Sequence, residues 1–192
     1  MKIDELVGYK NKPEYQAVKD TGFIFGYGGL KDKLTNLGYN KYELGSGLYG
    51  SVYARPEDDF VVKIFTPDMG YKRYLDYMQN NKMNPYVPKL RGKPVKLPNN
   101  FTMVRIEKLE PITPDLFREI RHLMNPHSGD PTYGSPEYRA ARKKFENRYP
   151  QFLNLLDELT RTAENAGLAL DLHSGNIMMR NNLPVITDPF VG

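Results

Sequence analysis

A glycine-rich stretch at residues 44–52, Leu-Gly-Ser-Gly-Leu-Tyr-Gly-Ser-Val, is the feature that most constrains how this chain can fold. The residues around it include β-branched and aromatic types, which is typical of strands that meet at a turn. A second apolar run, Val61-Val62-Lys63, follows turn-forming residues at 55–59. The order of strand, glycine turn, strand, turn and strand predicts an antiparallel meander over residues 41–65.

The segments after this meander predict more of the same sheet and then helices. Thr66-Pro67-Asp68 is a typical helix start, and apolar residues then recur at helical spacing at Tyr71, Tyr74, Leu75 and Met78. Strands at 95–97 and 101–107 would complete a five-stranded sheet with one helix. Beyond Pro111 the patterns predict three helices, at 113–124, 135–148 and 150–166, and a final hairpin of strands at 177–179 and 185–187. We therefore expect an α+β fold.

The residues before the predicted sheet are expected to form an N-terminal extension. Residues 4–20 are polar and are expected to form a short helix, and a second glycine cluster at 22–29 is expected to be a loop. The domain organisation that follows is an extension over residues 1–40, a sheet-containing lobe over 41–108 and a minimal helical lobe over 109–192.

Composition limits the classes of protein to which the chain can belong. It has 192 residues, no cysteine and a formal charge of +4, and no apolar run approaches the length of a membrane span. Disulfides and cysteine-type zinc sites are excluded, and the three histidines show no metal-ligand spacing. We expect a cytoplasmic protein that does not enter a membrane.

Polar residues near the C-terminus suggest chemistry. Asp171 and Asn176 lie five positions apart in Asp-Leu-His-Ser-Gly-Asn, and Asp188 follows the predicted final hairpin in Thr-Asp-Pro-Phe. Each acid taken alone is more often a turn or cap residue. The combination with a glycine-rich loop and a lysine on the next apolar strand is much rarer.

Taken together, these stretches resemble the ATP-phosphate machinery of the protein-kinase-like fold, over about residues 41–190. The resemblance implies a two-lobed fold that uses ATP and Mg²⁺. By this resemblance Gly45, Gly47 and Gly50 would let backbone N–H groups approach the phosphates, and Val52 would cover the adenine. The hinge that meets the adenine would include Glu107, whose side chain is expected to be solvated, and Leu109.

The resemblance also implies roles for the ionisable residues. Lys63 would contact the α- and β-phosphates, and Asp171 would orient the acceptor hydroxyl. Asn176 and Asp188 would hold the metal ion. The Asp-Leu-His-x-Gly-Asn pattern is similar to that of small-molecule phosphotransferases and of bacterial and phage kinases. His173 would either brace the loop or contact phosphate.

Departures from the family pattern keep several functions open. The predicted helix after Lys63 has no glutamate to pair with the lysine. By the resemblance, the segments that usually grip a peptide substrate are expected to be absent. The first hypothesis is a compact protein Ser/Thr kinase of phage or bacterial type, with a protein substrate. The alternatives are a small-molecule phosphotransferase and a nucleotide-binding pseudokinase that docks to another protein or to a second copy of itself. Nucleic-acid binding by a basic helix over residues 139–148 ranks last, because it depends on charge alone.

Overall fold

The computed structural model describes residues 13, 32, 34–47, 50–66, 69–97, 100–124 and 134–191, with the backbone alone for 41–47. The helix expected at 4–20 and the loop expected at 22–29 therefore lie outside the described residues, apart from Pro13. The chain divides into two compact units. The first contains residues 1–82 and 88–108, and the second contains residues 83–87 and 109–192. The domain boundaries expected from the sequence stay predictions.

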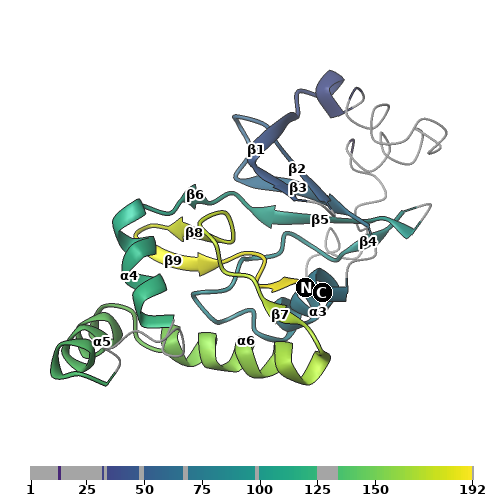
Figure 1. Cartoon of the computed structure of the whole chain (residues 1–192). Coiled ribbons are helices and arrows are strands. Elements are labelled where there is room, and N and C mark those ends of the chain that lie inside the picture. The colour runs from purple at the N-terminus through teal and green to yellow at the C-terminus, as the bar shows by residue number, and fades with distance from the viewer. Residues whose placement is uncertain are drawn as a thin grey trace. The chain divides into compact units, whose positions relative to one another are not determined.

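The first unit is built on a five-stranded antiparallel sheet (Figure 1). The strand order is β1-β2-β3-β5-β4, and one helix, α3, follows β3 along the chain. The strands are β1 (Asn40–Gly47), β2 (Gly50–Ala54), β3 (Phe60–Phe65), β4 (Val95–Lys96) and β5 (Thr102–Glu107), and α3 spans Met69–Asn80. The predicted meander and the predicted five-stranded sheet are confirmed.

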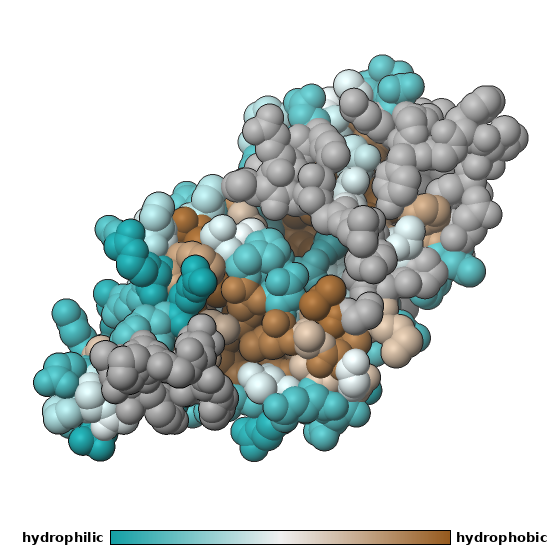
Figure 2. Space-filling model, in the orientation of Figure 1, coloured by the Kyte–Doolittle hydropathy of each residue, from teal (hydrophilic) through white to brown (hydrophobic). Residues whose placement is uncertain are grey.

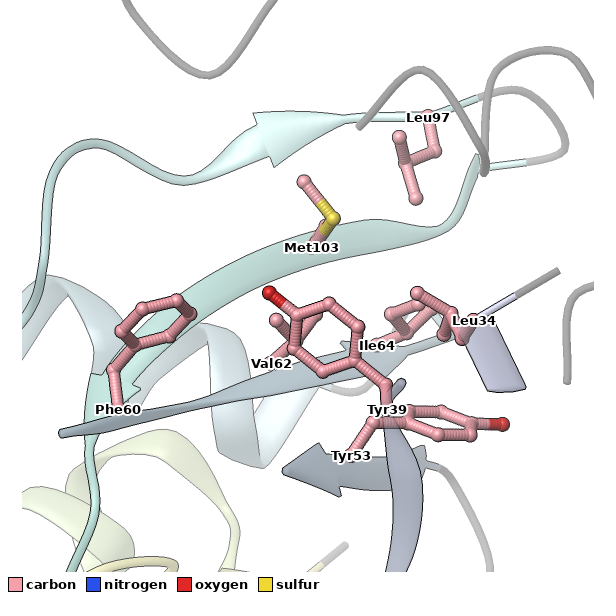
Figure 3. Close-up of a cluster of buried hydrophobic side chains, with 8 residues drawn as sticks. All are labelled: Leu34, Tyr39, Tyr53, Phe60, Val62, Ile64, Leu97 and Met103. Carbon is pink, nitrogen blue, oxygen red and sulfur yellow. The ribbon is translucent and has the colours of Figure 1, made fainter. Parts of the chain in front are cut away.

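One face of this sheet packs against a hydrophobic cluster (Figure 3). Side chains alternate between the two faces of a strand, so Phe60, Val62 and Ile64 of β3 share one face. They pack with Leu34, Tyr39, Tyr53, Leu97 and Met103, all of which are buried. The opposite face of β3 carries Val61, Lys63 and Phe65, and Lys63 is the one residue of the strand that is not fully buried.

Helix α3 has the apolar row that the sequence predicts. Tyr71, Tyr74, Leu75 and Met78 are all buried, and Gly70 is buried with them. The Phe65 and Tyr71 rings meet edge-on with centroids 4.6 Å apart. Helix α3 therefore packs through Tyr71 on the sheet face that carries Phe65 and Lys63.

The second unit contains helices and short antiparallel strands. The helices are α4 (Pro114–Met124), α5 (Pro136–Arg148) and α6 (Phe152–Ala166). The strands are β6 (Glu110–Pro111), β7 (Ala169–Leu170), β8 (Ile177–Arg180), β9 (Leu183–Ile186) and β10 (Phe190–Val191), paired as β6-β8-β9 and β10-β7. The final hairpin is confirmed, whereas β6, β7 and β10 are two-residue strands that the sequence patterns do not reveal.

Local chemistry explains where these helices begin and end. Ser135 caps α5, because its hydroxyl accepts a hydrogen bond from the Tyr138 N–H at 3.1 Å. Helix α6 begins at Phe152 rather than at Pro150, since Gln151 has a left-handed φ of 68°. Gly167, also left-handed with φ 66°, ends α6 as predicted.

The core of the second unit is aromatic. The ring of Phe152 lies 5.2 Å from that of Tyr86 and 5.7 Å from that of Phe145, centroid to centroid. Burial, with a smaller contribution from Tyr149, raises the pKa of Tyr86.

Hydrophilic residues cover the visible side of α5, at the lower left of Figure 2. Within the described part of the chain, no helix combines the length and apolar character needed to cross a bilayer.

The segment Met83–Val87 is bound to the β8–β9 hairpin of the second unit. The Arg180 guanidinium donates to the carbonyls of Pro85 and Val87, at 2.6 and 3.0 Å. The Ile186 N–H donates to the carbonyl of Tyr86 at 3.0 Å. This part of the connection between α3 and β4 therefore belongs to the second unit by its hydrogen bonds, in agreement with the division of the chain into compact units.

Candidate functional site

Two backbone ladders bring together three of the predicted site residues in the second unit. Ile177 pairs with Ile186 in the β8–β9 hairpin, and Leu170 pairs with Phe190 in the β7–β10 pair. Each ladder continues beyond its strands, because the Asp171 N–H donates to the Pro189 carbonyl at 2.7 Å and the Thr187 N–H to the Asn176 carbonyl at 2.8 Å. Asp171 and Asn176 thus lie directly beside the chain that carries Asp188.

The side chains of Asp171 and Asn176 are in direct contact. The Asn176 amide nitrogen donates to the Asp171 carbonyl oxygen at 2.8 Å and lies 3.4 Å from its carboxylate oxygen Oδ2. Both contacts use the amide nitrogen, so the amide oxygen of Asn176 is the atom that a cation would meet. The Asn176 side chain therefore closes the loop between β7 and β8 through its amide nitrogen, and its second polar atom is the amide oxygen.

His173 braces the same loop. Its Nδ1 accepts a hydrogen bond from the Gly175 N–H at 3.0 Å, and its carbonyl accepts one from the Asn176 N–H at 2.9 Å. An accepting Nδ1 means that the neutral ring carries its proton on Nε2. That atom lies 3.8 Å from Asp171 Oδ2. The bracing role, one of the two offered by the sequence, thus has a specific hydrogen bond behind it.

This loop and the connection between β9 and β10 together offer donor atoms that fit a hard cation. Asn176 and Asp188, both half-buried, supply an amide oxygen and a carboxylate, which are the ligand types that Mg²⁺ prefers. Over the described ranges, no three histidine, aspartate or glutamate side chains gather in a metal-binding arrangement. A metal ion at Asn176 and Asp188 would therefore be held by few protein atoms, as is usual where substrate phosphates complete the coordination.

In the first unit the structure aligns Val52 with Lys63. They are direct partners across β2 and β3, and Lys63 is opposite Val104 of β5. Directly opposed residues of an antiparallel pair project on the same side, so Val52, Lys63 and Val104 share one face of the sheet. The apolar stem of Lys63 therefore lies between two valines.

The Lys63 ammonium contacts an aromatic ring of α3. Its Nζ lies 3.4 Å from the centroid of the Tyr71 ring, well within the range of a cation–π interaction. The acid of α3, Asp76, is exposed, and so is Gln79, while Asp68 lies outside the described residues. The contact with Tyr71 was not predictable from the sequence, because an aromatic residue at helical spacing is ordinarily interpreted as a core residue.

The glycine-rich hairpin has the expected topology. Gly47 pairs with Gly50, so that a two-residue connection links β1 to β2. Gly45 lies where the β1–β2 register is irregular, between the pairs formed by Lys41 and Ser46. At Gly50 a Cβ atom would lie 3.0 Å from both the Ile64 carbonyl oxygen and the Phe65 Cβ. A side chain at this position would therefore crowd β3, which is a reason for glycine that the sequence pattern alone did not supply.

The expectation for the Glu107 side chain was wrong. It is buried rather than solvated, and its Oε1 accepts a hydrogen bond from the Lys89 N–H at 2.7 Å. Its own N–H donates to the Lys89 carbonyl at 3.0 Å. The carboxylate thus fastens the segment before β4 to the end of β5, an arrangement that follows from a pairing between residues 18 positions apart.

The residue after Glu107 is also engaged within the first unit. The Lys108 N–H donates to the Asp59 carbonyl at 2.8 Å, and its ammonium donates to the Arg55 carbonyl at 2.9 Å. Leu109, the first residue of this stretch in the second unit, is buried. Adenine recognition by Glu107 and Leu109 stays a prediction, and it would have to use backbone groups other than the N–H groups of Glu107 and Lys108.

The predicted site residues thus form two sets. Val52 and Lys63, with Gly50 at the start of β2, belong to the first unit, whereas Asp171, Asn176 and Asp188 belong to the second. Within each set the residues are adjacent through strand register or direct hydrogen bonds.

Comparisons with known proteins add little to this geometry. No family model matches the chain, and no curated protein matches it. Among solved structures, the chain is similar to the kinase PK-1 of Cydia pomonella granulovirus, with 17% sequence identity and a TM-score of 0.41. The match covers 80% of this chain and 54% of that one, so the chain spans about half the length of the viral kinase. A likeness of this size carries no argument about function.

Proposed function

We propose that the chain is an ATP-dependent phosphotransferase that uses Mg²⁺. The observation that carries the proposal is the Asp171–Asn176 pair, in which the amide nitrogen of Asn176 is bonded to Asp171 while backbone ladders hold the Asp188 segment beside them. Phosphoryl transfer requires little covalent chemistry from the protein. It requires a carboxylate to orient the acceptor, oxygen ligands for the metal, and positive charge for the phosphates. The two sets of residues offer at least one group for each need.

Each residue has a specific task in this proposal. Asp171 accepts a hydrogen bond from the acceptor hydroxyl and thereby directs the hydroxyl oxygen toward the phosphoryl group. Lys63, held on the sheet by Val52 and Val104, binds phosphate oxygens through its ammonium. Asn176 and Asp188 would hold Mg²⁺, which supplies charge neutralisation of the phosphates when it is bound. The backbone near Gly50 would cover the phosphates.

We further propose that the acceptor is a Ser/Thr hydroxyl of a protein, as in compact kinases of phage or bacterial type. An ionised carboxylate only accepts hydrogen bonds, so Asp171 suits a neutral hydroxyl as its partner. The same chemistry would serve the hydroxyl of a small molecule. The acceptor assay below therefore includes both kinds of substrate.

A transfer assay tests the proposal. Purified protein is given Mg²⁺ and ATP labelled at the γ-phosphate, with itself, a casein-like protein and an aminoglycoside as acceptors. Asp171→Ala is expected to lower the rate by about 10²-fold or more. Asp157→Ala is the matched control, since Asp157 is an exposed aspartate of α6. Transfer that survives Asp171→Ala, while Asp157→Ala behaves identically, would refute the role of Asp171.

A nucleotide-binding pseudokinase is the second candidate, and one observation favours it. Helix α3 contains no glutamate, whereas active kinases pair this lysine with a glutamate of the helix. Under this alternative, ATP would raise the melting temperature and no acceptor would be labelled. Its biological partner would then be another protein, or a second copy of the chain, recognised without phosphate transfer.

A further inference from the structure

Tyr71 occupies a distinctive place in the first unit. Its side chain is 1% exposed, and its ring meets two residues of β3: the Phe65 ring edge-on and the Lys63 ammonium at 3.4 Å from the ring centroid. Phe65 and Lys63 are two positions apart and therefore project on the same face of the strand. The ring is thus fixed by an aromatic neighbour and presents its face to the lysine.

We propose that Tyr71 is the positioning residue of Lys63, and that it acts through the face of its ring. The inference rests on the proposed nucleotide-binding function, which it deepens by naming what aims the phosphate-binding cation. Helix α3 offers little else for the purpose, since its buried row is Gly70, Tyr71, Tyr74, Leu75 and Met78 and its acid, Asp76, is exposed.

The physical basis is the negative face of an aromatic ring. A cation over this face is attracted without losing its charge and without giving a hydrogen bond to a competing anion. An ammonium group has three N–H donors, so those that point away from the ring can bind phosphate oxygens. Val52 and Val104, opposite Lys63 on the neighbouring strands, restrict the conformations that its aliphatic stem can adopt. The ring then orients the ammonium group at the end of this stem.

The role of the ring separates from that of the hydroxyl by substitution. Tyr71→Phe keeps the ring and its packing, whereas Tyr71→Leu removes the π face. Tyr74→Leu is the matched control, because Tyr74 is equally buried on the same helix and its ring stacks on Tyr77, with centroids 6.2 Å apart. Any general effect of losing a buried ring from α3 should appear in both leucine variants. An effect on Lys63 should appear in Tyr71→Leu alone.

The first measurement is the affinity for Mg-ATP by calorimetry. Tyr71→Phe is expected to stay within about twofold of the parent, and Tyr71→Leu is expected to weaken binding by about tenfold, which is the size of a partly buried cation–π contact. Tyr74→Leu should lower the melting temperature but leave the affinity unchanged. In a Lys63→Ala background, Tyr71→Leu should cost nothing further, because the two residues act as one unit.

The second measurement needs no nucleotide. In protein carrying ¹³C-labelled lysine, the ε-methylene protons of Lys63 should be shifted upfield by the ring current of Tyr71. The shift should persist in Tyr71→Phe and in Tyr74→Leu and disappear in Tyr71→Leu. A Lys63 signal at the ordinary lysine position in the parent protein would overturn the inference.

The outcomes separate this inference from the proposed function. If the parent protein binds no ATP but the upfield shift follows the Tyr71 ring as described, the nucleotide function fails and the contact remains. If ATP binds and Lys63→Ala weakens it, while Tyr71→Leu and Tyr74→Leu bind as tightly as the parent, the function stands and the positioning role of Tyr71 is refuted. A loss in Tyr71→Phe as large as in Tyr71→Leu would refute the ring and assign the role to the hydroxyl.

Discussion

Replacing Asn176 by alanine tests the hydrogen bonding that closes the candidate catalytic loop. The substitution removes the 2.8 Å bond from the side-chain amide to the Asp171 carbonyl and the 3.4 Å contact to its carboxylate. The backbone bonds of Asn176, from its N–H to the His173 carbonyl and from the Thr187 N–H to its own carbonyl, need no side chain. The strand register at β8 should therefore survive, and only the loop should lose stability.

The magnitude follows from the geometry. Removing the 2.8 Å bond leaves the partly buried Asp171 carbonyl without the Asn176 donor. A hydrogen bond of this kind contributes about 1 kcal/mol to the free energy of unfolding. The 3.4 Å contact lies at the outer limit of hydrogen-bond distances and should add little. For a chain of this size, about 1 kcal/mol corresponds to a fall in melting temperature of about 2–4 °C.

The assay is thermal unfolding followed by circular dichroism, with Asn154→Ala as the matched control. Asn154 is an exposed residue of α6, so that variant should melt within about 1 °C of the parent. Asn176→Ala should also lose phosphate transfer, because the amide oxygen proposed to bind Mg²⁺ goes with the side chain. An Asn176→Ala protein as stable as Asn154→Ala would refute the reasoning about the loop, whatever its activity.

Three further predictions concern stability. Gly50→Ala should lower the free energy of unfolding by about 1–3 kcal/mol in urea titrations, since the new methyl group would lie 3.0 Å from the Ile64 carbonyl oxygen; unchanged stability would contradict the close packing. Ser135→Ala should cost about 1 kcal/mol through loss of the α5 cap. The pKa of Glu137 is lowered by its own backbone N–H and by Ser135, so its contribution is present at neutral pH and lost as pH falls through the lowered pKa. Stability should therefore depend less on pH in acid in Ser135→Ala than in the parent, and an identical acid profile would argue against the contact. Arg180→Met should expose the segment Met83–Val87 to faster amide hydrogen exchange than Arg161→Met, and equal exchange would show that the two guanidinium bonds do not hold it.

Strand patterns were the most predictable part of the fold. The alternation and turn residues between 41 and 65 determine the meander, and the Gly47–Gly50 pairing puts the turn where the glycines indicate. The apolar row of α3 was likewise predictable, because Tyr71, Tyr74, Leu75 and Met78 lie at helical spacing. These features depend on residues close in sequence, which is where pattern arguments are strongest.

Features that depend on distant partners were not predictable. The two-residue strands β7 and β10 exist because Leu170 pairs with Phe190, twenty positions away, and neither segment has a strand pattern of its own. The buried carboxylate of Glu107 is explained by Lys89, and the bound segment at 83–87 by Arg180. Sequence spacing cannot reveal such pairs, because each residue taken alone resembles an ordinary exposed charge.

For the candidate site, the chemical roles assigned from the sequence stay predictions, and the sequence did not indicate how the residues are held. The five-residue spacing of Asp171 and Asn176 suggested that they belong to one loop, and a hydrogen bond joins the two residues across this loop. The brace from His173 Nδ1 to the Gly175 N–H was one of two roles considered. The contact between Lys63 and Tyr71 was not predicted, since it depends on how α3 packs on the sheet.

The proposed function requires that Lys63, Asp171, Asn176 and Asp188 act on one Mg²⁺-bound triphosphate. The most direct test is a crystal structure of the chain with Mg²⁺ and a non-hydrolysable ATP analogue. The account predicts phosphate oxygens within hydrogen-bond distance of the Lys63 ammonium, and a metal ion coordinated by the Asn176 amide oxygen and the Asp188 carboxylate. A nucleotide bound elsewhere, or one bound with these four side chains out of reach of its phosphates and metal, would contradict it.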